Sequence, residues 1–257
     1  MRRVAAQAWA LTRRSVLATW RQPGSWIPGL FFPLMLAAVY AAQFQRATEL
    51  PQFPTDSFLE FILPASILQG VSFGSTNGGT DLANDIDSGF FDRLVVTPVS
   101  RLSILLGRIA GSAVFSAVQA TVLIVVFVVF GAEVAAGFWG IVAIVAIATT
   151  LAVGIGGFGL AFALRTGNAE ATQSTFPLVF ALVFVSSAFF PVQLMSGWYR
   201  WAAERNPLTF VIDATRRLVL SGWSWGDLAE GLLVSGAVAV VSLSLAGRAY
   251  RARLRAT

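Results

Sequence analysis

The stretch VAAGFWGIVAIVAIATTLAVGIGGFGLAFAL, residues 134–164, contains no charged side chain. As an α-helix rising about 1.5 Å per residue it would be about 46 Å long, which exceeds the roughly 30 Å hydrocarbon core of a bilayer. It is too short for two crossings joined by a turn, so it predicts one transmembrane helix. A charge at the centre of such a helix costs about 2.5–3.5 kcal/mol on the insertion scale, so charge-free windows indicate where the chain crosses a membrane.

Five further windows of the chain are also free of charge. They cover residues 22–45, 61–80, 109–132, 171–199 and 231–247. Pro191 interrupts the 171–199 window, so we expect its helix to end near Phe190. The last window is at the lower limit of the length needed to cross a bilayer. The sequence therefore predicts an all-α integral membrane protein with six transmembrane helices.

The composition excludes several classes of protein. A mean hydropathy of +0.72 with only 12% charged residues argues against a soluble globular domain. The chain has neither His nor Cys, which excludes zinc, haem and iron–sulfur sites of the usual kinds and both Ser-His-Asp and Cys-His catalysis. All 18 basic side chains are Arg, so a P-loop lysine is missing and the chain has no ATPase site of that kind. We predict no catalytic, cofactor-binding or metal-binding residues.

The arginines are distributed unevenly between the segments that connect the windows. One side holds five before the first window, three within 81–108, Arg165 and four after the last window, whereas the other side holds Arg46 and four between 200 and 217. The positive-inside rule then predicts a multi-pass protein of the cell (cytoplasmic) membrane with both termini in the cytoplasm. No cleaved signal peptide is expected, because the first window begins late. Since the arginines flank apolar segments, the net charge of +5 indicates membrane topology, and no nucleic-acid partner is expected.

Residues 1–21 have the pattern of an amphipathic helix. At 100° per residue, one face carries Arg3, Arg14 and Arg21, and another carries Trp9, Val16 and Trp20. Arginine on one side with apolar and aromatic side chains on the other is typical of a helix that lies on a membrane facing anionic lipid. The alternative is a frayed, basic leader.

The segment between the fifth and sixth windows, residues 191–226, predicts an external re-entrant hairpin. Pro191 and Pro207 divide it into two short helices. Its tryptophans, which suit a membrane–water boundary, are Trp198, Trp201, Trp223 and Trp225. Asp213 stands three and four residues before Arg216 and Arg217, so one helical face can pair its own charges. The backbone of such a hairpin has to be buried in protein, because irregular chain cannot face lipid.

Glycine patterns within the windows predict close helix packing. GIGGFG at 154–159 matches the dinucleotide-binding pattern, but it lies inside an apolar window without the strand–helix–strand context. Two overlapping GxxxG patterns occur at Gly70, Gly74 and Gly78, and another at Gly107 and Gly111. Such patterns serve contacts within one subunit or between two, and the sequence leaves both possibilities open.

Ionisable side chains lie only at the ends of the windows. This placement disfavours a proton-coupled transporter, which would need acids or bases within its spans. The nearest approach to a metal site is the group Asp81, Asp85, Asp87 and Asp92, and a metal site there is not favoured.

DIDSGFFDRLVVTPVSRLSILLGR, residues 85–108, is a polar interruption between two windows. We expect a short helix lined by Asp85, Asp87, Asp92 and Arg93, with Gly89, Phe90 and Phe91 forming an apolar corner. Thr97 and Pro98 would end that helix, and the next helix would begin near Ser100. An exposed apolar pair flanked by charges is typical of a docking surface.

This stretch resembles the signature loop of type-2 ABC exporter permeases, in particular the daunorubicin-resistance-type membrane subunits. The matching positions are Asp87, Gly89, Asp92, Arg93, Thr97, Pro98, Arg101, Gly107 and Arg108. The family commonly has Glu where this chain has Asp92, a mild departure. NPLT at 206–209, followed by Arg216, is similar to the segment that precedes the last span in that family. The resemblance covers nearly the whole chain, so residues 1–257 are expected to form a single transmembrane domain.

The resemblance implies a half-transporter for export. A separate ATP-binding subunit would bind ATP and Mg, and a second copy of the permease or a homologous permease would complete the path. Residues 81–103 would be the coupling loop on the ATPase, with contacts from Asp85, Asp87, Gly89, Phe90, Phe91, Asp92, Arg93, Thr97, Pro98 and Arg101. The hairpin would cap the path, through Asn206, Pro207, Asp213 and Arg216.

The cargo expected from the resemblance is amphipathic or lipid-like. The chain's 21 Phe and eight Trp residues suit such a compound, but the sequence does not distinguish a drug from a polyketide, a glycolipid or a polysaccharide precursor. Two other functions remain open at this point. One is a secondary, ion-coupled transporter, and the other is a membrane anchor or sensor that transports nothing.

Overall fold

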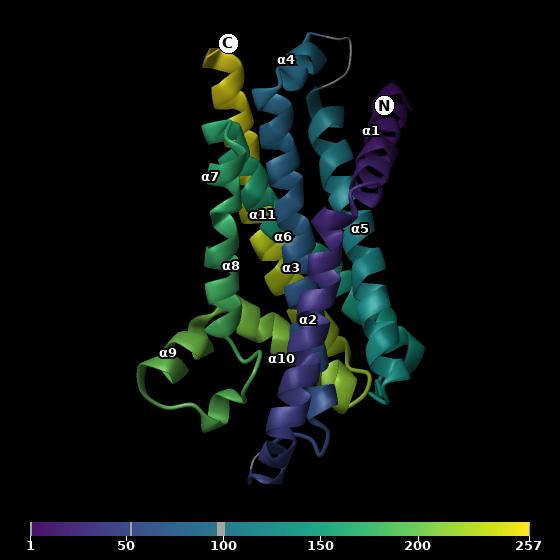
Figure 1. Cartoon of the computed structure of the whole chain (residues 1–257), viewed down its shortest axis with the longest axis vertical. Helices are drawn as coiled ribbons and strands as arrows, with labels where there is room; N and C mark the ends of the chain where they lie inside the picture. Colours follow the sequence, from purple (N-terminus) through teal and green to yellow (C-terminus); the bar gives the residue numbers. More distant parts are fainter. Residues whose placement is uncertain (1, 52, 97–100, 257) are drawn as a thin grey trace.

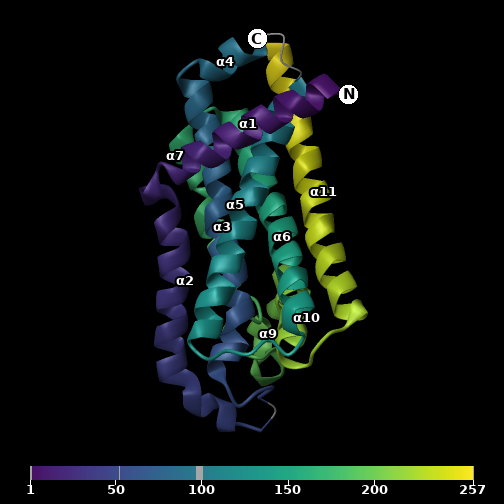
Figure 2. The same cartoon turned by 90° about the vertical axis from the view of Figure 1, so that its right-hand side faces the viewer.

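Helices make up the computed structural model, which describes residues 2–51, 53–96 and 101–256. The α-helices in these ranges are α1 Arg2–Trp20, α2 Pro23–Phe44, α3 Phe58–Asp87, α4 Phe90–Val95, α5 Arg101–Val129, α6 Gly137–Thr166, α7 Ala169–Gln173, α8 Thr175–Phe184, α9 Gly197–Arg205, α10 Pro207–Leu220 and α11 Trp225–Ala256. Two short 3₁₀ helices, Gln45–Glu49 and Val192–Leu194, follow α2 and precede α9. The long helices run along one axis, and both ends of the chain lie at the same end of the bundle (Figures 1 and 2).

Five helices of the described residues are long and apolar enough to cross a membrane. They are Trp26–Glu49, Phe58–Asp87, Leu106–Val129, Gly137–Thr166 and Trp225–Arg253. These correspond to the first four predicted windows and to the sixth, which is considerably longer than expected from its charge-free part. The prediction that residues 134–164 form a single helix is confirmed, since α6 is continuous over 30 residues.

The fifth predicted window does not form one continuous helix up to Phe190. It is divided into α7 and α8 at Ser174, and the helical conformation ends at Phe184. Pro177 lies in the first turn of α8, where its missing N–H is tolerated but would break an uninterrupted helix. With ten residues, α8 is about 15 Å long and is too short to cross a bilayer by itself.

The loop predicted over residues 81–103 is also shorter than expected. Helix α3 continues to Asp87, so Asp85 and Asp87 belong to its last turns and not to a separate short helix. The short helix α4 contains Arg93, and α5 begins at Arg101, close to the predicted start at Ser100. The predicted stop at Thr97 and Pro98 lies outside the described residues.

The N-terminal segment is helical, as its pattern predicted, and α1 lies obliquely across the end of the bundle (Figure 2). It packs on α5 at two glycines: a Cβ atom placed on Gly107 would lie 2.5 Å from the Cβ atom of Leu11, and one on Gly111 would lie 2.6 Å from the Oγ atom of Ser15. Trp9 and Trp20 on α1 are exposed. The GxxxG pattern of α5 therefore serves a contact within the subunit.

Helix α3 lies at the centre of the bundle, in contact with α2, α5, α6 and α10. Its closest approach is to α6, where a Cβ atom on Gly79 would lie 2.7 Å from the carbonyl carbon of Gly159. Gly70 of the α3 glycine pattern accommodates α5, since the Nε2 atom of Gln119 donates to its carbonyl oxygen at 2.9 Å. This pattern also makes its contacts inside the subunit.

The GIGGFG segment of α6 packs against two neighbouring helices. On the α11 side, a Cβ atom at Gly154 would lie 3.0 Å from the backbone nitrogen of Ala239, and one at Gly157 would lie 2.4 Å from the Oγ atom of Ser242. On the α3 side, a Cβ atom at Gly156 would lie 3.3 Å from the carbonyl oxygen of Ser75. The predicted role of these glycines in close helix packing is confirmed.

The contact between α3 and α6 provides a test of this packing. Gly79→Ala places a methyl group against backbone atoms that cannot move aside, and overpacking of this kind costs about 1–3 kcal/mol. We expect the thermal unfolding midpoint of the detergent-solubilised chain to fall by several degrees. Gly236→Ala on α11 is the matched control, because a Cβ atom there meets nothing within 4 Å. Equal midpoints for the two variants would contradict the close contact.

Candidate functional site

The first candidate site is the corner between α3 and α4, which we call the α3–α4 corner (residues 84–93). The end of α3 is closed by backbone hydrogen bonds, in which the N–H of Ser88 donates to the carbonyl of Asn84 and the N–H of Gly89 to that of Ile86, both at 3.0 Å. Gly89 has a φ of +68°, a left-handed conformation that favours glycine at the end of a helix. A Cβ atom on Gly89 would meet nothing within 4 Å, so this position is open.

Arg93 is held on the surface of the α3–α4 corner. Its Nε atom donates to the carbonyl of Gly89 at 3.3 Å and its Nη2 atom to that of Ser88 at 3.4 Å. The side chain is exposed, so it caps carbonyls at the end of α3 while its remaining N–H groups face solvent. The geometry leaves Arg93 able to pair with an acid on another protein.

The two phenylalanines of the corner differ in their environment. Phe91 is buried in an apolar cluster that includes Leu82 and Leu164, and its ring lies edge-on to Tyr250 of α11 with the ring centroids 6.0 Å apart. Phe90 is half-buried and lies beneath the guanidinium of Arg14, 4.2 Å from the ring centroid to Cζ. The prediction of an exposed apolar pair is therefore wrong: Phe91 anchors α4 to the bundle, and Phe90 contacts α1.

The acids predicted for the corner are also separated from one another. Asp85 forms an ion pair with Arg108 of α5, a pairing that was not predicted. Asp87 is exposed at the end of α3. The side chains of Asp92 and Arg101, and all of Thr97 and Pro98, lie outside the part of the chain that the structure describes. Within that part, no three acidic side chains gather to hold a metal ion.

The second candidate site is the hairpin of α9 and α10. Asn206 lies between these two helices and also bonds to the end of α8. Its Oδ1 atom accepts from the N–H of Leu208 at 2.9 Å and so caps α10, with Pro207 at the first helical position. Its Nδ2 group donates to the carbonyls of Leu182 and Val185 at 2.7 and 3.1 Å. The amide therefore fixes the start of α10 to the end of α8.

Arg216 of α10 is the buried centre of the hairpin. Its Nη2 atom donates to the carbonyl of Ser187 at 2.7 Å, and its Nε atom donates to the carbonyl of Phe61 of α3 at 3.2 Å. Cζ also lies 3.9 Å from the centroid of the Phe61 ring. The guanidinium thus connects α10 to α3 and to the segment after α8.

The charge of Arg216 is balanced by one carboxylate. Its Nη1 atom donates to Oδ1 of Asp213 at 2.7 Å, and the same oxygen accepts from the hydroxyl of Ser187 at 2.7 Å. Burial lowers the pKa of Arg216 to about 10, and the nearby Asp213 carboxylate opposes that shift, so the guanidinium stays protonated at neutral pH. The predicted pairing of Asp213 with Arg216 is confirmed.

Arg217 does not pair with Asp213 as the spacing suggested. It forms ion pairs with Asp227 and Glu230 of α11 instead. These ion pairs connect α10 to α11, in addition to the connection that Arg216 makes to α3. The sequence offered no signal for them, because these acids follow a separate tryptophan-rich turn.

The family sequence model described as "ABC-2 type transporter" matches residues 6–220, a range that begins in α1, contains the α3–α4 corner and ends with α10. The chain belongs to the ABC-2 type transporter family. The resemblance found in the sequence is therefore confirmed, and the chain is a transport permease of the ABC type with several membrane helices.

Individual relatives of this ABC-2 protein agree with that assignment. This chain is 28% identical over 238 residues to a putative transport permease, ycf38, of Pyropia yezoensis. The alignment covers 88% of this chain and 81% of the relative. The chain is 26% identical over 223 residues to the daunorubicin resistance ABC transporter permease protein DrrB1 of Streptomyces coeruleorubidus, covering 86% and 76%. A probable doxorubicin resistance permease, DrrC, of Mycobacterium tuberculosis is 26% identical over 167 residues, covering 65% and 60%.

The buried guanidinium of the hairpin leads to a stability prediction. Arg216→Met removes the cation that pairs with Asp213, which keeps only the Ser187 hydroxyl as donor, and it leaves the carbonyls of Phe61 and Ser187 without the guanidinium. Breaking a buried charge pair costs about 3–5 kcal/mol. We expect a large loss of folded, monodisperse protein and a much lower unfolding midpoint. Arg200→Met is the control, since the Arg200–Glu204 pair is exposed and such pairs contribute about 1 kcal/mol or less. Similar stability of both variants would show that Arg216 does not hold the hairpin.

Proposed function

We propose that this ABC-2 protein is the transmembrane subunit of an ATP-driven exporter. It would form the path for an amphipathic or lipid-like compound and work with a separate cytoplasmic ATP-binding subunit, which binds ATP and Mg. The observation that carries the proposal is the family match over residues 6–220 in a chain that has no P-loop lysine. Energy for transport would then have to come from a second polypeptide.

The cargo class is proposed on the basis of two relatives. Their names associate them with resistance to daunorubicin and to doxorubicin. A drug, polyketide or glycolipid with an apolar body and a polar end fits the proposed class. Cargo of this class can reach the path from the bilayer as well as from the cytoplasm.

For the topology, we propose six crossings with both termini in the cytoplasm. Helices α7 and α8 are stacked end to end in Figure 1, and together they complete the fifth crossing beside the five long helices. An even number of crossings agrees with the position of both chain ends at one end of the bundle. The hairpin of α9 and α10 lies toward the opposite end and would be the external, re-entrant cap of the path.

Cysteine labelling tests this topology, since the chain has no cysteine of its own. We expect Ser88→Cys to react with an impermeant maleimide only in inverted vesicles, and Ser221→Cys only in intact cells. Both positions are exposed, and Ser88 directly follows α3 at the α4 end of the bundle, whereas Ser221 directly follows α10 of the hairpin. Labelling of Ser88→Cys from outside, together with protection of Ser221→Cys, would show that the orientation is the reverse of the one proposed. Labelling of both from one side would mean an even number of crossings between them, whereas the proposal places three there.

For coupling, we propose that the ATP-binding subunit docks on the α3–α4 corner. Figures 1 and 2 show α4 at the outermost end of the bundle, beside the chain termini. Gly89 is open and Arg93 is exposed, so both are accessible to a partner. A second copy of the chain, or a homologous permease, would complete the path from the other side.

The coupling assignment is tested by export into inverted vesicles with the ATP-binding subunit present. Gly89→Trp should sharply reduce ATP-dependent export and co-purification of that subunit, because a large side chain at an open position holds the two surfaces apart. Gly89→Asn is the matched control, since Asn tolerates a φ of +68° and adds little bulk. Arg93→Ala should weaken the coupling equilibrium roughly 30-fold if its charge pair is desolvated.

Three results, from this assay or from the chain tested without the ATP-binding subunit, would contradict the proposal. Export and co-purification at the parent level in both Gly89→Trp and Arg93→Ala would reduce the corner to a simple connector. Export driven by an ion gradient without the ATP-binding subunit would indicate a secondary transporter. ATP hydrolysis by the chain alone, free of any partner, would contradict the argument from the missing lysine.

A further inference from the structure

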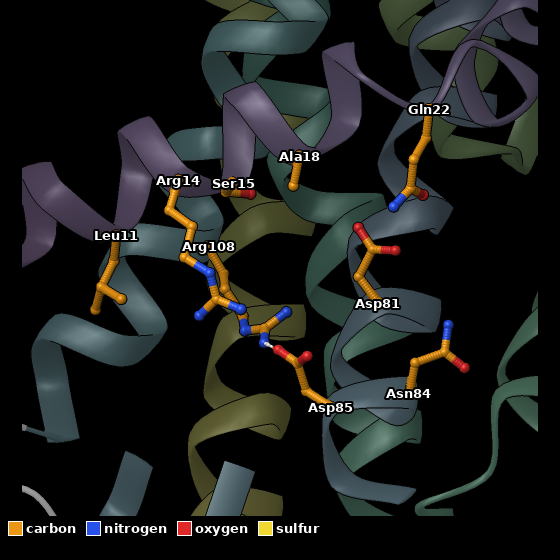
Figure 3. Close-up of a pocket in the computed structure, with 9 residues that line it drawn as sticks. All are labelled: Leu11, Arg14, Ser15, Ala18, Gln22, Asp81, Asn84, Asp85 and Arg108. Carbon is orange, nitrogen blue, oxygen red and sulfur yellow. Dashed lines mark hydrogen bonds and ion pairs between the residues drawn. The ribbon is translucent and has the colours of Figure 1, made fainter. Parts of the chain in front are cut away.

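A cavity of about 260 Å³ lies between α1 and the ends of α3 and α5 (Figure 3). Arg14 and Ser15 of α1 line one wall, Asp81 and Asp85 of α3 line another, and Arg108 comes from α5. We call this cavity the α1 pocket, and α1, which lines it, lies at the same end of the bundle as α4 and the chain termini (Figure 2). Most of the side chains that line the pocket are polar or charged, and α1 covers it.

The charges of the α1 pocket are only partly compensated within the chain. Arg108 and Asp85 form an ion pair and neutralise each other. Asp81 is partly buried, and it forms no hydrogen bond or ion pair with any residue that the structure describes. Arg14 forms no ion pair there either, and its described contact is with the face of the Phe90 ring. Asp81, which Arg108 attracts without forming an ion pair, and Arg14 are therefore each left without a hydrogen-bonded partner of opposite charge in the same cavity.

These two groups lie on opposite sides of the neutral pair. In Figure 3, Arg14 is on one side of the Arg108–Asp85 pair and Asp81 is on the other. A free anion would be attracted by Arg14 but repelled by Asp81, and a free cation would meet the reverse. A ligand that carries an anionic and a cationic group a short distance apart satisfies both.

The surroundings of the α1 pocket point to a lipid as the source of that ligand. Trp20 stacks on Trp26 at the junction of α1 and α2, with ring centroids 5.5 Å apart, and Trp9 is exposed on α1. Tryptophans of this kind mark the depth of the lipid head groups. A second hollow of about 370 Å³, lined by Arg13, Leu17 and Arg21 among others, adjoins the pocket through Arg14 and adds basic groups beside an apolar side chain.

We propose that the α1 pocket binds the head group of an aminophospholipid, with the phosphate on Arg14 and the primary ammonium on Asp81. Guanidinium groups bind phosphate oxygens through paired, charge-assisted hydrogen bonds. A primary ammonium donates hydrogen bonds to a carboxylate, whereas the quaternary ammonium of a choline lipid has no N–H to donate. The volume of the pocket equals that of about nine water molecules in the liquid, which is enough for a phosphoethanolamine group.

This assignment rests on the placement of α1 at the membrane surface and not on the proposed export. The test is accordingly a binding measurement on the purified full chain without any ATP-binding subunit. Native mass spectrometry in detergent gives the dissociation constant of the first bound lipid. The probes are phosphatidylethanolamine, phosphatidylcholine and phosphatidylglycerol with identical acyl chains.

We expect the parent chain to bind phosphatidylethanolamine at least about tenfold more tightly than the other two lipids, which is the loss typical of one missing charge-assisted hydrogen bond. Asp81→Asn should abolish that preference, while Arg14→Gln should weaken all three lipids about tenfold. The controls Asp87→Asn and Arg251→Gln remove exposed charges outside the pocket and should leave every affinity unchanged. Ala18→Phe fills the pocket from an exposed position of α1 and should block binding without disturbing the buried core.

Several results would overturn the assignment. They are equal affinity of the parent chain for the three lipids, tighter binding of phosphatidylglycerol, and an unchanged preference in both Asp81→Asn and Ala18→Phe. Soluble phosphoethanolamine that binds as tightly as the lipid would show that the ligand is not a lipid. Unfolding midpoints of all variants in lipid-free detergent separate loss of binding from loss of folding.

Discussion

Carbonyl groups that are freed where a helix ends inside a membrane protein must find donors within the protein, because the hydrocarbon core supplies none. The end of α8 presents this problem, and α10 solves it. Asn206 donates to the carbonyls of Leu182 and Val185, and Arg216 donates to that of Ser187. The hairpin is therefore held by specific hydrogen bonds to the broken backbone in addition to apolar packing. This requirement explains why a charged side chain is buried there at all, despite the cost of desolvation.

The same guanidinium extends this constraint to the centre of the bundle. Arg216 also donates to the carbonyl of Phe61, near the start of α3, and this 30-residue helix ends at Asp87 in the α3–α4 corner. At that other end, Phe91 is buried with Tyr250 of α11, so α4 is fixed to the bundle. In the proposed export cycle, a force applied by the ATP-binding subunit on α4 reaches the hairpin through one continuous helix.

Most of the bundle was predictable because a charge in a span is expensive, and the charge-free windows located five long helices. The prediction of one continuous helix in the fifth window was wrong. An apolar composition indicates burial in lipid or protein, but it does not indicate whether a helix is continuous. In the corner, Gly89 was expected only as part of an apolar corner, and its left-handed conformation, which closes α3, was not predicted. The burial of Phe91 was not predictable, because Tyr250 is distant in the sequence and the contact depends on how α11 packs. For Arg216, only the partner one helical turn away could be inferred from spacing.

Among the side chains that the structure describes, the charged contacts of α3 lie near its two ends, and its interior makes neutral ones. The Asp85–Arg108 pair is near one end, and the Phe61 contact with Arg216 is near the other. Between them, the hydroxyl of Ser75 donates to the carbonyl of Ser72 within α3, and Gln119 reaches across from α5 to Gly70. Glycine backbones such as Gly79 and Gly159 meet there without interlocking side chains. Neutral hydrogen bonds and smooth backbone contacts are cheaper to exchange than a buried ion pair, so a shift of α3 against its neighbours is easiest when its charged ends keep their partners. The end contacts therefore define the pivots about which α3 can move in the proposed cycle.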